Sequence, residues 1–250
     1  MRRLWLRWTL LIIFVAMLGV VFVNLGEWQL DRLAQRKERN ATTVSNEAKP
    51  LQPYEQVFTH PITDADQWQR VEAHGIFDAE HQFVVRYRSN GDADGYEVVT
   101  PLRTATGAVL VDRGFIPLEH GARIPSAAPA PPTGEVTVVG HVRRSEKGRR
   151  VATTPVNNQI RLINSDAIGP TLTYPITSGY IGLLTVQPEQ PGGFQPIQLP
   201  ELSEGPHFWY AVQWFMFTAV AAAGIVVFIR SDLRARREER DQAAEAHATV

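Results

Sequence analysis

The sequence predicts an α+β membrane protein in which two transmembrane helices flank one β-rich, antiparallel, extracytoplasmic domain. Three observations support this fold class: an apolar block near each end of the 250-residue chain, a series of short β-type segments between them, and an uneven distribution of basic residues. The mean hydropathy of −0.16 hides both apolar blocks, because it averages them with a long polar middle.

The first apolar block runs from about Trp8 to Leu25. At ~1.5 Å per residue it is long enough to cross a bilayer core of ~30 Å. Three arginines precede it, as they would in a signal peptide. The block is nevertheless long for a signal sequence, and the following NLGEWQ lacks a small-x-small cleavage site. We therefore favour an uncleaved anchor, with residues 1–8 in the cytoplasm and residues 9–27 in the membrane.

The second apolar block runs from about Phe208 to Ile229 and is followed by five arginines between Arg230 and Arg240. No Lys or Arg occurs between Arg161 and Arg230, so the other flank of this block carries no basic residue. The positive-inside rule places the C-terminus in the cytoplasm. Two spans then require a cytoplasmic N-terminus as well. The few residues before the first span leave no room for an organelle transit peptide, which favours a bacterial cytoplasmic membrane.

The remaining boundaries follow from these two spans. The extracytoplasmic domain covers residues 28–205, and its residues 28–40 extend the first helix. The second span covers residues 206–229, and a basic cytoplasmic tail covers residues 230–250.

Short β-type segments fill the predicted domain, with Gly and Pro at most of their boundaries. They lie at 68–75, 82–88, 95–102, 108–114, 135–144, 159–164 and 180–186. This spacing is typical of an antiparallel sheet or a small barrel. The proline-rich segment 125–132 is expected to be an exposed loop. Ser165 is expected to cap a short helix at 165–169.

The residue inventory excludes several function classes. The chain has no cysteine, which removes disulfides, CxxC redox chemistry and thiolate metal sites. Its histidines form no HxxxH or HExxH pair, and no GxSxG, P-loop or GxGxxG motif occurs. The net charge of −1 gives no indication of nucleic-acid binding. We therefore expect a protein that is not an enzyme, and an anchored hydrolase is the least supported alternative.

Two charged groups in the domain have an ordinary structural explanation. Asp112 and Arg113 are expected to form a salt-bridged turn at the end of a strand. Basic residues between Arg143 and Arg150 are expected to lie in a solvated hairpin loop; the alternative is a docking patch for a partner or for lipid headgroups.

The outer edge of the two spans is more informative. Trp28, Gln29 and Arg32 leave the first span together. The second span opens with residues whose spacing places them on one helix face: His207, Tyr210 and Trp214. An aromatic belt at the membrane surface explains the tryptophans and the tyrosine without any further function.

An aromatic belt does not explain His207. An imidazole is a common ligand of haem iron, and flat apolar rings surround this one in the sequence. We therefore consider a haem site formed by His207, Tyr210 and Trp214, with His207 as the ligand to the iron. The alternative is an interfacial histidine that forms a hydrogen bond to the outer domain.

Two amides at matching depth predict helix packing. Asn24 and Gln213 each lie four residues, or ~6 Å, inside an interfacial tryptophan, Trp28 and Trp209 respectively. Amide side chains at membrane depth require a hydrogen-bond partner. We therefore predict that the two spans pack side by side, with Asn24 and Gln213 facing each other or a common third helix. Trp28, Gln29 and Arg32 complete this set of helix-packing or partner-binding residues.

Four segments, in order along the chain, are similar to the motifs of a known family. They are LGEWQLDR (25–32), VEAHGIFD (71–78), GYEVVTPLRTATGAVLVDRGFIP (95–117) and PHFWYAVQWF (206–215). With them the chain resembles the Surfeit-locus assembly factors of cytochrome c oxidase over most of its length. It departs from the family pattern at Phe115, where tryptophan is usual, and at Arg36 and Lys37, where a lone lysine is expected.

The resemblance implies a helper that assists delivery or insertion of haem a into the catalytic subunit of cytochrome c oxidase. Expected partners are that subunit, the synthase that makes haem a, and membrane lipid; haem a itself would bind transiently. The absence of cysteine fits this role better than copper delivery, which normally uses thiolates. The alternative is a structural subunit or stabiliser of an oxidase complex that makes no haem contact.

Overall fold

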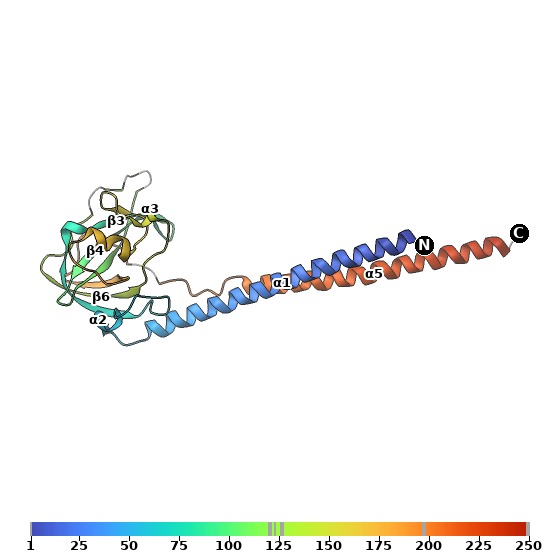
Figure 1. The fold of residues 1–250 in the computed structure, drawn as a ribbon, viewed down its shortest axis with the longest axis horizontal. Coiled ribbons are helices and arrows are strands. Elements are labelled where there is room, and N and C mark those ends of the chain that lie inside the picture. Colours follow the sequence, from blue (N-terminus) through green and yellow to red (C-terminus); the bar gives the residue numbers. More distant parts are fainter. Residues whose placement is uncertain (1, 120–121, 123, 126–127, 197–198, 249–250) are drawn as a thin grey trace. The chain divides into compact units, whose positions relative to one another are not determined.

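The computed structural model describes the chain except residues 1, 120–121, 123, 126–127, 197–198 and 249–250 (Figure 1). The chain forms two compact units. The first combines Met1–Asn40 with Leu202–Val250, and the second is Ala41–Glu201. Residues 28–40 therefore group with the terminal helices, although the sequence analysis assigned them to the domain.

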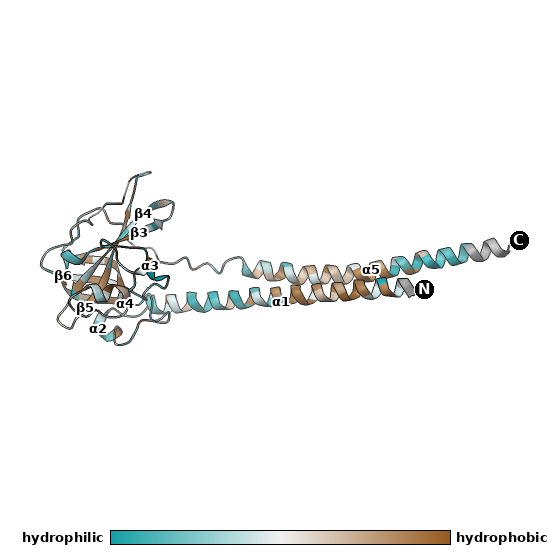
Figure 2. Cartoon of the chain, turned by 45° about the horizontal axis from the view of Figure 1, so that its top comes forward, coloured by the Kyte–Doolittle hydropathy of each residue, from teal (hydrophilic) through white to brown (hydrophobic). Residues whose placement is uncertain are grey.

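The first unit is built from two long helices, α1 (Arg2–Glu47) and α5 (His207–Ala248). Both are long and apolar enough to cross a membrane, by length and composition. Figure 2 shows an apolar stretch in each, followed by a polar one. Helix α1 continues to Glu47, beyond the predicted end at Asn40. No proline interrupts it before Pro50, so nothing in the sequence stops it earlier.

The two helices pack against each other in antiparallel register. Phe22 contacts Trp214, with ring centroids 5.6 Å apart. Gly26 permits this packing, because a Cβ atom there would lie 2.7 Å from the ring of Phe215. One series of less exposed positions of α1 recurs every three or four residues, with Gly19, Val23 and Leu25 also less exposed beside it: Trp8, Leu11, Val15, Leu18, Phe22, Gly26, Gln29, Leu33, Arg36 and Asn40. This spacing is the heptad pattern of a two-helix coiled coil.

The second unit is rich in strands. They are β1 (Gln52–Pro53), β2 (Arg70–Phe77), β3 (Phe83–Asn90), β4 (Ala93–Arg103), β5 (Ala108–Pro117), β6 (Glu135–Arg143), β7 (Gln159–Ile160) and β8 (Tyr180–Gln187). All seven predicted β segments contain a strand, although in segment 159–164 only two residues belong to one. Short helical turns join them: α2 (Tyr54–Val57), η1 (Ala79–His81), α3 (Arg150–Thr153), α4 (Ser165–Ile168) and η2 (Gly169–Thr171).

Five of the strands close into a small barrel. The pairing order is β2–β6–β8–β5–β4, and the ring closes where Ile76 and Phe77 of β2 pair with Arg103 and Leu102 of β4. Strand β3 pairs with β4 from Ala93 to Val99. The prediction of an antiparallel sheet was only partly right, because β1–β2, β3–β7 and β5–β8 are parallel pairs. Each joins segments separated by a long connection, which lets the chain return in the same direction.

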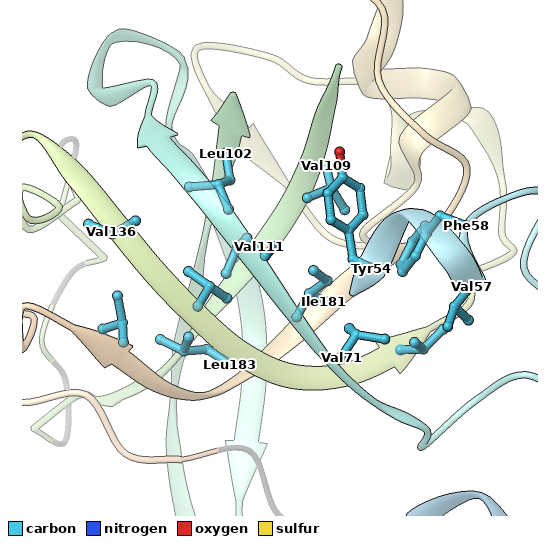
Figure 3. Packing of buried hydrophobic residues seen from close by; sticks show 14 of the residues in the cluster. Tyr54, Val57, Phe58, Val71, Leu102, Val109, Val111, Val136, Ile181 and Leu183 are labelled. Carbon is cyan, nitrogen blue, oxygen red and sulfur yellow. The ribbon is translucent and has the colours of Figure 1, made fainter. Parts of the chain in front are cut away.

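The barrel interior holds the main hydrophobic core (Figure 3). Alternate residues of the strands point inward, such as Val109 and Val111 of β5, which are fully buried. Helix α2 contributes Tyr54 and Val57 to the same cluster. The hydroxyl of Tyr54 lies 2.6 Å from Thr104 Oγ1, so its polar atom is satisfied.

One local prediction was wrong, and another was right only in part. The cap of helix α4 is Asn164, whose Oδ1 accepts a hydrogen bond from the amide of Ala167 at 2.9 Å. Ser165 instead shares a hydrogen bond with Ser145. The described residues of the proline-rich segment form a loop without helix or strand, as predicted, but Pro131 and Pro132 are buried rather than exposed; residues 126–127 lie outside the described residues.

Candidate functional site

The candidate site is the place where α5 begins beside α1. His207, the first residue of α5, has Nδ1 2.8 Å from Oε1 of Gln29 in α1. An amide oxygen only accepts hydrogen bonds, so in this arrangement Nδ1 donates, and in the neutral imidazole Nε2 is then the nitrogen that has a lone pair. Within the described part of the chain, no hydrogen bond involves Nε2 of His207.

A glycine lies against the edge of the imidazole that carries Nε2. A Cβ atom at Gly205 would lie 3.4 Å from Cδ2 of His207 and 3.6 Å from its Nε2. Gly205 has φ +70°, a conformation that favours glycine over other residues. The turn before α5 therefore brings backbone, but no side chain of residue 205, against this edge.

The three residues predicted to share a face point in two directions. His207 and Trp214 face α1, where they contact Gln29 and Phe22 respectively. Tyr210 is 46% exposed, and Trp209 beside it is 71% exposed. The aromatic rings near the imidazole thus offer an exposed apolar surface, while Trp214 serves the packing of the helix pair.

One face of α1 holds the segment that leads into α5. Nε of Arg36 donates to the carbonyl of Ser203 at 2.9 Å, and Nδ2 of Asn40 donates to the carbonyl of Leu202 at 2.9 Å. With Gln29, these residues are spaced seven and four apart, so they share one face. Asn40 and Ser203 were not among the residues predicted from the sequence. Beyond the apolar block, the heptad positions of α1 continue with polar residues. This pattern could have indicated that the same face contacts another part of the chain.

The other predicted residues on α1 lie away from His207. The guanidinium of Arg32 stacks over Trp28, 5.4 Å from the ring centroid, and donates to Gln35. Trp28 is 48% exposed. Of the three residues that leave the first predicted span together, only Gln29 contacts the histidine.

Asn24 and Gln213 lie at the same level of the helix pair, because the contacts of Phe22 and Gly26 with α5 bracket that level. Their side chains are both exposed. Nδ2 of Asn24 donates to the carbonyl of Val20 at 2.7 Å. Among the described residues there is no hydrogen bond between the two amides. Contact of both with a common third helix stays a prediction.

The domain contains a separate, buried cluster of charges. Arg88 forms ion pairs of 2.7 Å with Glu97 and with Glu146. Burial would lower the pKa of Arg88, but the two carboxylates outweigh this effect and raise it. Burial raises the pKa of Glu97, and it raises the pKa of the fully buried Asp112 strongly. Inside the domain, the positive charge of Arg88 is thus paired with the carboxylates of Glu97 and Glu146.

The prediction of a salt-bridged turn at Asp112 and Arg113 was wrong, because both side chains are buried in strand β5 and point to different partners. Arg113 donates to the carbonyls of Pro129 and Ala130 at 2.8 and 3.1 Å. It also donates to the side-chain oxygens of Gln82 and Gln190 at 2.7 and 3.0 Å. Burial lowers the pKa of Arg113 to about 10. This arginine ties the proline-rich segment to the barrel.

The described residues of the domain contain four histidine–carboxylate pairs: His60 with Asp66, His74 with Glu72, His81 with Asp78, and His141 with Glu47. A threonine hydroxyl lies 3.3 Å from Nδ1 of His60 and another lies 3.0 Å from Nδ1 of His74, and both of these histidines are exposed. Nδ1 of His81 lies 2.8 Å from Oδ2 of Asp78, which also accepts from the hydroxyl of Tyr174. Burial would raise the pKa of Asp78, but the hydrogen bonds from Tyr174 and His81 lower it. Among the described residues no serine or threonine hydroxyl is hydrogen-bonded to His81, and no three His, Asp or Glu residues could hold a metal ion together.

The chain thus combines a barrel domain with two terminal apolar helices and a histidine oriented where those helices meet. Comparison with known proteins identifies the family. The sequence profile of the SURF1 family matches residues 16–219, and the chain belongs to this family. The SURF1 family is known as a family of cytochrome oxidase assembly factors, not of catalysts.

The relatives support this assignment over nearly the whole chain. Uncharacterized SURF1-like proteins of Mycobacterium tuberculosis and Mycobacterium bovis are each 28% identical over 237 residues, covering 92% of this chain and 86% of the relative. A SURF1-like protein of Monosiga brevicollis is 31% identical over 229 residues, covering 84% of both chains.

Proposed function

We propose that this protein is a membrane-anchored assembly factor for haem–copper cytochrome c oxidase, and that it assists delivery of haem a to the catalytic subunit. Family membership and the two apolar helices support the proposal. In it, residues 9–27 and 206–229 span a bacterial cell membrane. Both termini are cytoplasmic, and the barrel domain lies on the other side.

One observation carries the haem part of the proposal: the 2.8 Å hydrogen bond between His207 Nδ1 and Gln29 Oε1. Metal-binding histidines commonly donate their second N–H to an oxygen acceptor, which fixes the tautomer and the ring orientation. Gln29 does this for His207 and leaves Nε2 available. Gly205 places no side chain beside that atom, and Tyr210 adds an exposed ring on the same helix. The residues present therefore fit an axial ligand of haem a, which is the cargo here.

The alternative function is that of a structural subunit or stabiliser of the oxidase without haem contact. The same hydrogen bond supports it, because a histidine bonded to Gln29 also joins the two helices at their outer end. The packed face from Phe22 to Asn40 would then present the helix pair as one rigid element to the catalytic subunit.

The two functions are separated by purifying the full chain in detergent from a host that makes haem a. We expect the wild type to carry haem in its absorption spectrum, and His207→Ala to lose it while still co-purifying with the oxidase catalytic subunit. His74→Ala removes a domain histidine 67% exposed in its side chain and serves as the matched control. A haem spectrum unchanged in His207→Ala would exclude ligation by His207, and a wild type that co-purifies with the catalytic subunit but carries no haem would favour the structural role.

A further inference from the structure

A strained tyrosine marks one surface of the barrel domain. Tyr87 has φ +61°, which is rare for a bulky residue and marks sites where the surrounding structure enforces the conformation. The register between β3 and β4 shifts between Arg86 and Arg88, as in a β-bulge. The shift leaves the side chain of Tyr87 63% exposed.

Two guanidinium groups hold the exposed ring. The Cζ atom of Arg86 lies 4.9 Å from the ring centroid of Tyr87, and that of Arg161 lies 4.8 Å from it. Arg86 also donates to the tyrosine hydroxyl at 2.9 Å. Arg88, on the other side of the bulge, forms ion pairs with Glu97 and Glu146 instead. The bulge therefore separates Arg88, which is ion-paired, from a group formed by the ring of Tyr87 and the guanidinium groups of Arg86 and Arg161.

More cations adjoin this group. The amide of Arg161 donates to the carbonyl of Ala152, so the turn of α3 lies beside it. Arg149 and Arg150 begin that turn and are exposed, and Val151 after them is 82% exposed. We call Arg86, Tyr87, Arg149, Arg150, Val151 and Arg161 the basic patch.

The basic patch lacks counter-charges. In the described residues none of its four arginines forms a salt bridge, and the nearby Glu146 is already paired with Arg88. The chain as a whole has a net charge of only −1, so this concentration of positive charge is local. Uncompensated cations on a surface attract acidic partners and steer their approach.

We propose that the basic patch is a docking surface for an acidic segment of a partner protein. Tyrosine and arginine are among the residues most enriched at binding hot spots, and a ring held in place loses little entropy on binding. A lipid surface is bound by cations on flexible side chains and needs no fixed ring. The strained, doubly stacked Tyr87 therefore favours a protein partner. This surface is independent of His207 and of haem.

The test uses the full chain in nanodiscs of uncharged phosphatidylcholine. The probe is a fluorescent peptide with four glutamates and one aromatic residue, and binding is measured by fluorescence anisotropy. We expect the triple variant R149E, R150E and R161E to bind about tenfold more weakly, because three exposed attractions become repulsions. Binding by the wild type should weaken as salt is raised.

Two further variants complete the design. Tyr87→Asn removes the ring but tolerates the positive φ, and should weaken binding several-fold while leaving the salt dependence unchanged. Arg103→Glu reverses an exposed arginine at the far end of β4 and should bind like the wild type. Equal peptide binding by the wild type and the triple variant would overturn the proposal. So would a wild type that ignores the peptide but binds vesicles containing phosphatidylglycerol.

Discussion

Nδ1 of His207 lies 2.8 Å from Oε1 of Gln29, a residue 178 positions earlier in the chain. The contact joins the first residue of α5 to the face of α1 that also carries Arg36 and Asn40. It therefore combines two roles, because it fixes the orientation of the imidazole and it joins α1 to α5 where α5 begins. Each role can be tested separately.

Under the proposed haem function, Gln29→Leu should weaken haem binding without removing His207, the proposed ligand. The variant keeps His207 but removes the oxygen that fixes its tautomer, and loss of such a partner typically costs about 10- to 100-fold in metal affinity. Titration of detergent-purified protein with haem, followed by absorbance, measures the change. Gln35→Leu removes an amide further along α1 and should titrate like the wild type. Equal affinity of Gln29→Leu and the wild type would contradict the assigned role.

The helix pair can be tested with an engineered disulfide, since the natural chain has no cysteine. A Cβ atom at Gly19 would lie 3.8 Å from Cγ2 of Thr218, so Gly19→Cys with Thr218→Cys should form a disulfide under mild oxidation. Adding Gly26→Leu should reduce the yield strongly, because its side chain meets the ring of Phe215. The yield is read from a mobility shift on gels without reducing agent. An unchanged yield after the Gly26→Leu substitution would show that the helices do not meet at this position.

Arg113→Ala should destabilise the barrel domain. It leaves two carbonyls and two glutamine side chains without their buried donor, at a cost of about 3 kcal/mol. For a domain of this size the expected fall in Tm is roughly 10 °C. Thermal unfolding of the full chain, followed by near-ultraviolet circular dichroism, measures it. Arg113→Lys keeps the charge but not the planar fork, and its Tm should fall between those of Arg113→Ala and the wild type. If Arg113→Ala has the Tm of the wild type, the hydrogen bonds of Arg113 do not stabilise the barrel domain.

His141 should make the domain less stable in mild acid. Burial lowers the pKa of His141 below its usual 6.5, although Glu47, 2.6 Å away, opposes the shift. Below about pH 6.5 the unfolded chain then binds a proton that the folded chain does not. This contribution to stability is complete above about pH 6.5 and is lost as the pH falls through the lowered pKa.

The corresponding measurement is the Tm of the full chain between about pH 5 and 8, the range in which histidine titrates. His141→Gln should flatten the decrease at the acid end. His74→Gln leaves the buried imidazole in place and should keep the slope of the wild type. Identical slopes for His141→Gln and the wild type would show that His141 does not cause the decrease.

The apolar blocks and the β segments were predictable because both depend on local patterns. An unbroken apolar block produces a helix of membrane length, and each β-rich run between Gly and Pro produces a strand. The end of α1 at Glu47 was missed because helix propensity falls gradually there and no breaker precedes Pro50. The parallel pairs were missed because strand direction depends on long connections rather than on residue alternation.

The candidate site was predicted only in part. Gln29 and His207 were both singled out from their positions at the edge of the spans, but not as a hydrogen-bonded pair. Asp112 and Arg113 were misassigned because neighbouring opposite charges suggest a salt bridge. In a strand, consecutive side chains point to opposite faces, so the two residues cannot share one environment.

The sequence by itself determined the composition of this protein: two apolar helices, a β-rich middle, no thiol chemistry and the family motifs. These are properties of short stretches of chain, which local physics decides. Only the tertiary structure decided which side chains meet, such as Gln29 with His207, or Tyr87 with Arg161. Those contacts join residues far apart in the chain, and their geometry depends on helix packing and strand register that no local pattern records.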